Sequence, residues 1–455
     1  MRAASFLGLL ICACLIGVPG VVRAQEGDEG EDTPASRPFR GLFGLADNGR
    51  TGLSAAGSLF GAYDDNLTAS LIGGATPDPR YQRSGGYGGA TGQLNYTWRG
   101  ERSAFSAFAS SAGNYYPDHD RPWVTSYSAG IGFSRPIGRR NSFSASQAVA
   151  YSPYFLFSLF PEEAGLDAPP VSPIEVTPDF SVSELTTLRY SSSLNLSRSL
   201  TRRSSVNAFY SFGGTTFDSV RDGHAMHRAG FGYRRRITGA LGLRLGYAYR
   251  TAQYALFAED GLERPRSRSH DVDAGVDYAK ALSVSRRTRI SFGTGSNILV
   301  REAASGGEAA PTGTITRFHA AGYFTLTREI GRTWGFSLNY DRSAAFSDVL
   351  LDPVLSDSVT ASLGGLVGRR NEIRFAASLS AGEVGFGDTD NGYSTYTASA
   401  QWRRALTRNV AAFARYLYYH YNFGGAVQLP TGFVRELDRQ GVRVGIQAWV
   451  PLLRR

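Results

Sequence analysis

The segment SRPIGRRNSF, residues 134–143, is one of eight short basic turns that decide the fold of this chain. The other seven are TWRGERSAF (97–105), SRSLTRRSSV (197–206), RRITGALGL (235–243), AKALSVSRRTRI (279–290), TREIGRTWGF (327–336), GGLVGRRNEI (364–373) and RRALTRNVAA (403–412). The turn centres recur at spacings of mostly about 37 to 46 residues, which is the length of two strands and one longer loop. The repeat therefore predicts a series of antiparallel hairpins.

The segments beside these turns alternate between apolar and polar residues, which predicts β-strands with two different faces. In residues 241–250, leucine and tyrosine occupy the odd positions, whereas glycine, alanine and arginine occupy the even ones. Two strands beside each turn, with a first strand at 53–63 and a last one at 441–450, give about 18 strands. A soluble β-sandwich also alternates, but long strands with Trp or Tyr near their ends favour a membrane barrel. The sequence thus predicts an all-β fold, a transmembrane antiparallel up-and-down β-barrel over residues 51–455.

Residues 1–24 have the features of a cleaved signal peptide. An apolar run of residues follows Arg2, and small residues precede a cleavage site after Ala24. The alternatives are a membrane helix or a lipoprotein site at Cys12 or Cys14. Both cysteines of the chain lie in this segment, so the mature chain would have no disulfide and no thiolate metal site.

Residues 25–50 are rich in glycine, proline and acidic residues, which predicts a periplasmic linker. The whole chain carries a net charge of +9, and Lys280 is its only lysine. Residues 1–40 hold four arginines and five carboxylates, a net charge of −1, which leaves +10 for the remainder. A basic soluble protein would suggest nucleic acid. An export signal with strand alternation instead indicates a basic pore, or a basic contact with lipopolysaccharide, in the bacterial outer membrane. Its partners would be outer-membrane lipid, lipopolysaccharide and the barrel assembly machinery, with no nucleic acid.

The first predicted strand ends in Gly61-Ala-Tyr-Asp-Asp-Asn66. This ending resembles the porin-2 type β-barrel family of the outer membrane, whose first strand often ends in Tyr-Asp-Asp-Asn or a similar sequence. Members often occur in polysaccharide secretion loci. The resemblance therefore implies export of surface polysaccharide or exopolysaccharide, with periplasmic export components as partners. The same residues would also suit an ordinary turn, because short polar side chains bond to nearby backbone.

No motif for covalent or metal chemistry is evident in the sequence. The six histidines lack the pattern of a zinc site, and Asp388-Thr-Asp-Asn-Gly392 lacks the distal glutamate of a calcium loop. No Gly-x-Ser-x-Gly elbow is present. We expect a non-enzymatic channel for hydrophilic solutes, with polysaccharide as the favoured cargo and without catalytic residues, cofactor or metal. The alternatives are a general diffusion porin, a non-conducting binding or structural barrel and, less favoured, a membrane-embedded hydrolase.

Inward polar residues would line the water-filled interior of such a barrel. Arginines there would offer paired hydrogen bonds to carboxylates and sugars. For the hairpin of 241–255 with 268–282, we predict a register that sets Arg250 opposite Asp271, Arg244 opposite Asp277 and Tyr247 opposite Ala274. The charged residues predicted to line the pore are Arg244, Arg250, Asp271, Asp273, Asp277, Arg374 and Arg403.

The link between Tyr151 and Leu185 is long, proline-rich and acidic, and it contains no arginine or lysine. A loop of this length is usually functional or disordered. If this loop folds into the lumen, it would narrow the pore and place its carboxylates opposite inward arginines. If it stays outside, it would only cover the entrance of the pore. The carboxylates of the possible constriction are Glu162, Glu163, Asp167, Glu175 and Asp179.

Deletion of residues 155–183 should therefore raise single-channel conductance in planar bilayers and shift ion selectivity towards anions, because it removes both bulk and negative charge. Substituting the five carboxylates by Gln or Asn is the matched control, since it should shift selectivity with a smaller effect on conductance. Unchanged conductance and selectivity in the deletion variant would place the loop outside the lumen.

Overall fold

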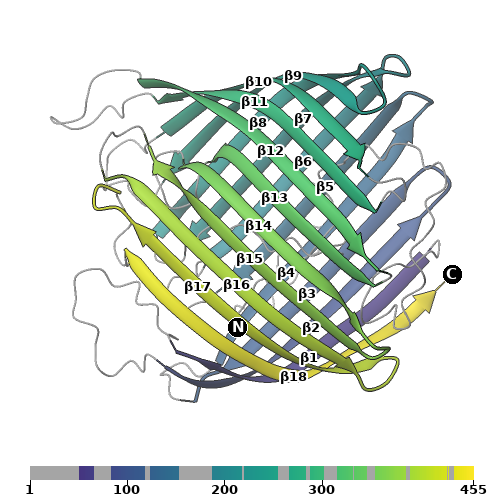
Figure 1. The fold of residues 1–455 in the computed structure, drawn as a ribbon, viewed down its shortest axis with the longest axis vertical. Helices are drawn as coiled ribbons and strands as arrows, with labels where there is room; N and C mark the ends of the chain where they lie inside the picture. Colours follow the sequence, from purple (N-terminus) through teal and green to yellow (C-terminus); the bar gives the residue numbers. More distant parts are fainter. Residues whose placement is uncertain are drawn as a thin grey trace.

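The computed structural model is a closed antiparallel barrel of 18 strands (Figure 1). The structure describes residues 51–65, 84–117, 123–152, 187–217, 220–254, 266–282, 287–301, 315–331, 333–345, 354–385, 390–427, 429 and 435–454. β1 (Thr51–Asp64) pairs with β2 (Gly85–Arg99) on one side and with β18 (Glu436–Arg454) on the other, which closes the sheet. The predicted fold class and strand number are confirmed.

The other strands follow in chain order, and each pairs with its two sequence neighbours. They are β3 (Ala104–Tyr115), β4 (Trp123–Ile137), β5 (Asn141–Ser152), β6 (Thr187–Ser199), β7 (Ser204–Phe217), β8 (Val220–Arg236), β9 (Leu241–Tyr254), β10 (Arg266–Ala281), β11 (Thr288–Arg301), β12 (Ile315–Ile330), β13 (Trp334–Ala345), β14 (Val354–Val367), β15 (Asn371–Val384), β16 (Gly392–Ala405) and β17 (Val410–Phe423). This is the up-and-down order that the hairpin repeat predicts.

The short links between strands coincide with the eight basic turns. Gly138, Gly331 and Gly368 adopt positive φ angles of 70°, 65° and 69° in three of them, a conformation that glycine enters without steric cost. Because strand direction alternates, all eight links lie at one end of the barrel, where Gly52 pairs with Arg454. Their placement in the periplasm follows the general rule for such barrels and stays a prediction.

Three predicted segments lie outside the described residues. They are the signal peptide (1–24), the linker (25–50) and the acidic loop with Glu162, Glu163, Asp167, Glu175 and Asp179.

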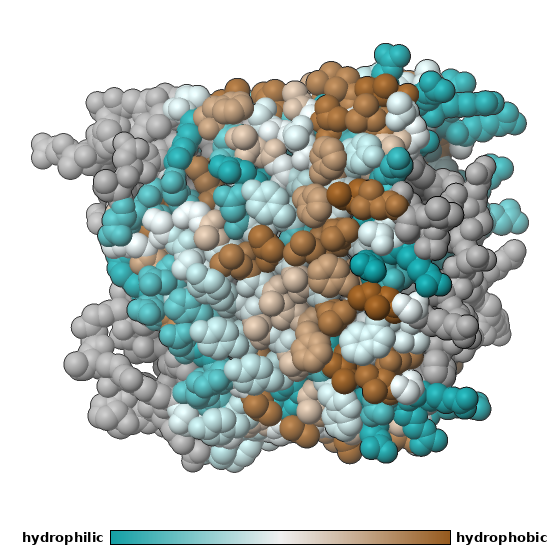
Figure 2. All heavy atoms as spheres, viewed as in Figure 1, coloured by the Kyte–Doolittle hydropathy of each residue, from teal (hydrophilic) through white to brown (hydrophobic). Residues whose placement is uncertain are grey.

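Large apolar side chains cover the outside of the barrel. Leu59, Phe318 and Phe231 are 69%, 67% and 62% exposed. Hydrophobic residues form a band across the viewed face, with hydrophilic residues towards both ends (Figure 2). Among the described segments, no helix is long and apolar enough to cross a membrane. A sheet closed on itself with an apolar outer band satisfies its backbone polar groups within lipid, so this chain is an outer-membrane barrel.

The predicted register of β9 with β10 is wrong by two residues. Arg250 pairs with Ser269, Arg244 with Gly275 and Tyr247 with Val272. A two-residue shift keeps every side chain on its predicted face, because side-chain direction has a period of two. The predicted ion pairs also exist, but they run diagonally between the strands. The reason is the length of arginine, whose tip reaches the residues that flank its direct partner.

A buried ion pair joins the two strands at which the barrel closes. Nε of Arg439 on β18 donates to both carboxylate oxygens of Asp64 at 2.9 and 2.8 Å, and Nη2 donates to Oδ2 at 2.6 Å. Both residues are at most 4% exposed. The next residue, Asp65, accepts a hydrogen bond from the backbone N–H of Gln440 at 2.8 Å. The Tyr-Asp-Asp segment at the end of the first strand therefore fastens it to the last one.

The observed register predicts which cysteine pairs crosslink. Tyr247→Cys with Val272→Cys should oxidise readily, because directly opposed Cβ atoms lie about 4.5–5.5 Å apart, close to disulfide geometry. Tyr247→Cys with Ala274→Cys should react poorly, since diagonal neighbours are about 7–8 Å apart. Electrophoresis with and without reductant after mild oxidation measures both. A faster reaction of the second pair would reject the register described here.

The ion pair between Asp64 and Arg439 should be a large contributor to the stability of the closed barrel. Asp64→Asn alone should lower the free energy of unfolding by about 3–5 kcal/mol, because it leaves a buried guanidinium without its carboxylate. The double variant Asp64→Asn/Arg439→Gln should recover much of this loss, since it removes both charges. Urea unfolding of the detergent-solubilised protein measures the free energy of unfolding of the four proteins in this double-mutant cycle. Additive effects of the two substitutions would contradict a direct coupling.

Candidate functional site: the inner face of the barrel

The inner face is the set of strand positions that alternate with the exposed apolar residues. Small hydroxyl residues recur on it along β1–β7 and β13–β16, among glycine, alanine and larger side chains, and they form the majority on β5, β6 and β14. Their side chains form hydrogen bonds directly across neighbouring strands. These pairs are Ser58–Thr91 at 2.6 Å, Ser110–Ser128 at 2.5 Å, Ser337–Ser362 at 2.6 Å and Ser378–Thr397 at 3.0 Å. Much of the inner wall is therefore polar and uncharged.

A charged ladder occupies the inner face of β8–β10, and it contains five of the seven predicted pore-lining residues. Arg244 donates to Asp277 at 2.5 Å and also contacts Asp273, the two residues that flank its direct partner Gly275. A Cβ atom at Gly275 would collide with the carbonyl oxygen of Thr294, so only glycine leaves this strand spacing open. One guanidinium thereby contacts two carboxylates. If Arg244 stood directly opposite Asp277, as predicted, Asp273 would lie one position too far along the strand for the same contact.

The same ladder continues towards the opposite end of β10. Arg250 donates to Asp271 at 3.0 Å, and Arg228 on β8 lies 3.5 Å from the same carboxylate. Arg234 on β8 lies 3.7 Å from Asp277. Arg228 and Arg234 were not predicted, although both stand on the polar face of a strand that ends in the basic turn RRITGALGL.

Arg374 and Arg403, the other two predicted residues, form a separate cluster on β15 and β16. Both contact Glu372, which is 3% exposed: Nε of Arg374 donates to it at 2.9 Å, and Arg403 stands directly opposite it. Glu372 was not among the residues predicted to line the pore. The signal was present, because Glu372 and Arg374 share a face at a spacing of two.

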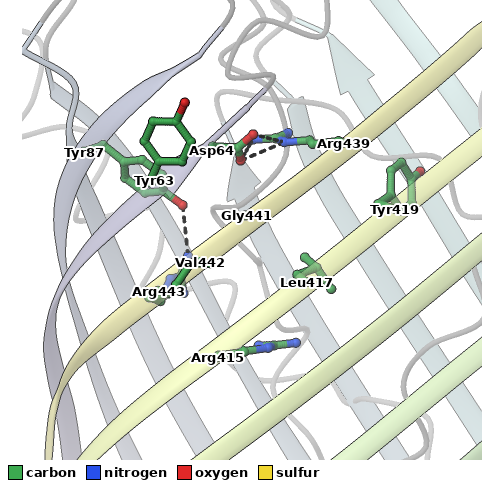
Figure 3. A pocket seen from close by; sticks show the side chains of 10 residues that line it. All are labelled: Tyr63, Asp64, Tyr87, Arg415, Leu417, Tyr419, Arg439, Gly441, Val442 and Arg443. Carbon is green, nitrogen blue, oxygen red and sulfur yellow. Dashed lines mark hydrogen bonds and ion pairs between the residues drawn. The ribbon is translucent and has the colours of Figure 1, made fainter.

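The cluster leads into a row of long polar side chains that crosses four strands. Arg374, Gln401, Arg415 and Arg443 are consecutive direct partners on β15, β16, β17 and β18. The row ends in a pocket at the junction of β17, β18 and β1 (Figure 3). The pocket is lined by Tyr63, Asp64, Tyr87, Arg415, Leu417, Tyr419, Arg439, Gly441, Val442 and Arg443.

Aromatic rings frame this pocket. The guanidinium of Arg443 lies 4.0 Å above the ring centroid of Phe60, and its Nη2 donates to the hydroxyl of Tyr87 at 3.4 Å. Tyr87 stacks on Tyr116 with ring centroids 4.9 Å apart. Tyr419 is 2% exposed and stands opposite Arg439. Figure 3 shows the side chains of Arg443 and Tyr87 pointing towards each other across the strands.

The residues of this pocket come from both ends of the chain, and sequence reasoning identified only the Asp64 segment. This segment was predicted to be a turn or a family motif, whereas Asp64 lies in the ion pair that joins β1 to β18. Within the described part of the chain, no group of three His, Cys, Asp or Glu residues could hold a metal ion.

No protein-family model matches this chain, and no curated protein matches it. Among solved structures, OccK2 (OpdF) of Pseudomonas aeruginosa in complex with glucuronate is similar over 89% of this chain and 98% of its own, with 9% identity and a TM-score of 0.43. The FrpB iron transporter from Neisseria meningitidis is similar over 89% and 83%, with 9% identity and a TM-score of 0.42. OccAB4 of Acinetobacter baumannii is similar over 89% and 99%, with 10% identity and a TM-score of 0.41. These likenesses are distant, and the outer-membrane barrel described here stands on its own strand order and outer face.

Proposed function

We propose that this barrel passes hydrophilic solutes across the outer membrane and that its cargo is a surface polysaccharide or exopolysaccharide chain. The observation that carries the proposal is the hydroxyl-rich inner wall of β1–β7 and β13–β16. Passage is by diffusion or threading and involves no covalent step. Under this proposal the passage is lined by Arg244, Arg250, Asp271, Asp273, Asp277, Arg374 and Arg403.

Hydroxyl walls suit a carbohydrate because they can exchange hydrogen bonds with it at little net cost. Ser and Thr hydroxyls both donate and accept, as sugar hydroxyls do. The pairs Ser110–Ser128 and Ser378–Thr397 can open towards a passing hydroxyl group and close again behind it. A wall of fixed charges would instead make hydrogen bonds to a neutral sugar that vary more in strength along the passage.

The choice of polysaccharide over small solutes draws its support from the Tyr63-Asp-Asp-Asn66 ending of the first strand. This ending resembles the porin-2 type β-barrels that occur in polysaccharide secretion loci. Periplasmic export components are then the expected partners. In a deletion strain, polymer retained in the periplasm would favour export, whereas normal surface polymer with slower sugar uptake would favour a general diffusion porin.

Conductance in planar bilayers tests the channel itself. Ser193→Trp with Ser211→Trp should reduce single-channel conductance, because these directly paired residues lie on the inner face. The matched control is Leu194→Trp with Tyr210→Trp, which is the next pair along the same strands and is 40% and 39% exposed on the outer face. The control should conduct as the unmodified barrel does. Equal conductance of all three proteins, or no conductance in any, would contradict a passage along the inner face.

A further inference from the structure

The outer face of the barrel repeats one pattern at the end where the basic turns lie. On six strands that lead into these turns, an arginine or lysine stands between two apolar residues, each two positions away and therefore on the same face. The triplets are Phe133-Arg135-Ile137 on β4, Leu196-Arg198-Leu200 on β6, Tyr233-Arg235-Ile237 on β8, Tyr278-Lys280-Leu282 on β10, Leu326-Arg328-Ile330 on β12 and Trp402-Arg404-Leu406 on β16. We call the six basic residues of these triplets the basic belt.

The basic belt makes the outer face positive at the turn end. All six of its members are exposed. The apolar residues Phe133, Leu196 and Trp402 on the same face are 37%, 49% and 38% exposed. On the strands that the structure describes, no carboxylate takes an outward position at this end. Outward carboxylates such as Asp357 and Asp438 lie near the opposite ends of β14 and β18.

The apolar residues on both sides of the belt indicate its depth in the membrane. A cation within the hydrocarbon layer is costly, and long basic side chains extend from there to the headgroups. A residue surrounded by water would not be followed by further apolar side chains, yet Ile137, Ile237 and Leu282 follow the belt and are 50%, 50% and 58% exposed. Figure 2 shows hydrophilic side chains directly beside the hydrophobic band at this end, where β18 terminates in Figure 1. The belt therefore lies at the level of the lipid headgroups.

We propose that the basic belt binds the phosphate groups of anionic glycerophospholipids in the leaflet at the turn end. Guanidinium and ammonium groups donate charged hydrogen bonds to phosphate, and basic residues beside a membrane attract anionic lipids. The members on β4, β6, β8, β10 and β12 stand two strands apart, about 9–10 Å across the sheet, so each can contact a separate headgroup. The turns are predicted to be periplasmic, which makes this the glycerophospholipid leaflet and not the lipopolysaccharide leaflet. The site is separate from the proposed passage, which runs along the inner face.

Quenching of Trp402 fluorescence by brominated lipids tests one member of the belt, because Trp402 stands two positions before Arg404 on the same face. The barrel is reconstituted in phosphatidylcholine bilayers that contain either brominated phosphatidylglycerol or brominated phosphatidylcholine. The part of the quenching that is absent from Trp402→Phe belongs to Trp402. Phosphatidylglycerol should be preferred there by about fivefold, since one basic residue at an anionic surface contributes about this factor.

Arg404→Gln should remove most of this preference. The charge-matched control is Arg408→Gln, in the exposed turn that follows β16, and it should keep the preference. Arg404→Lys should keep it as well, because an ammonium group also binds phosphate. Equal quenching by the two lipids in the unmodified barrel, or equal loss in the Arg404→Gln and Arg408→Gln variants, would overturn the site.

A second strand tests whether the site is a belt. Leu196→Trp places the probe beside Arg198 on β6, and Arg198→Gln and Arg202→Gln are then the test and control variants. Their results should match those on β16, whereas no preference for phosphatidylglycerol at residue 196 would reject the belt.

Gly239→Cys, in the turn after β8, identifies the leaflet, and its Cβ would meet no atom within 4 Å. A membrane-impermeant maleimide should react with this cysteine in permeabilised cells and not in intact ones. Reaction in intact cells would place the belt beside the phosphates of lipopolysaccharide and overturn its assignment to glycerophospholipids.

Discussion

A β-strand that crosses lipid must hydrogen-bond its backbone to a neighbour on each side, and the whole structure depends on that requirement. With 18 strands in chain order, only the pairing of β1 with β18 can meet it at the edges. Closure then gives every strand an outer face and an inner face. The outer face is apolar because it meets lipid, and Leu59 and Phe318 show this by their exposure. The inner face does not meet lipid, so it can carry hydroxyl groups and charges.

Strand number and side-chain direction could be predicted from the sequence because both depend on local features. The turns fix the hairpins through residues such as Gly138 and Gly368, and the period of two assigns each side chain to a face. Register could not be predicted in the same way. Arg250 contacts Asp271 in the observed register and would also contact it in the predicted one, so the charge pattern does not separate alignments that differ by two residues.

The inner face was predictable in part for a similar reason. Arg374 and Arg403 were assigned to it by alternation, and the same rule could have added Glu372. The pocket between β17, β18 and β1 was not predictable, because its contacts join residues from opposite ends of the chain. The hydrogen bond between Arg443 and Tyr87 can form only after the barrel has closed. No local sequence pattern identifies either residue as the partner of the other.

The ion pair between Asp64 and Arg439 has a consequence for biogenesis. Its two members are 375 positions apart, so they can meet only after all the intervening strands have been made and ordered. Until then β1 is an open edge, able to pair with another chain. The guanidinium of Arg439 reaches the carboxylate of Asp64 only from β18, so this ion pair forms only in a barrel whose last strand is in place. A chain that stops before Glu436 would keep the open edge and would lack the ion pair with Arg439.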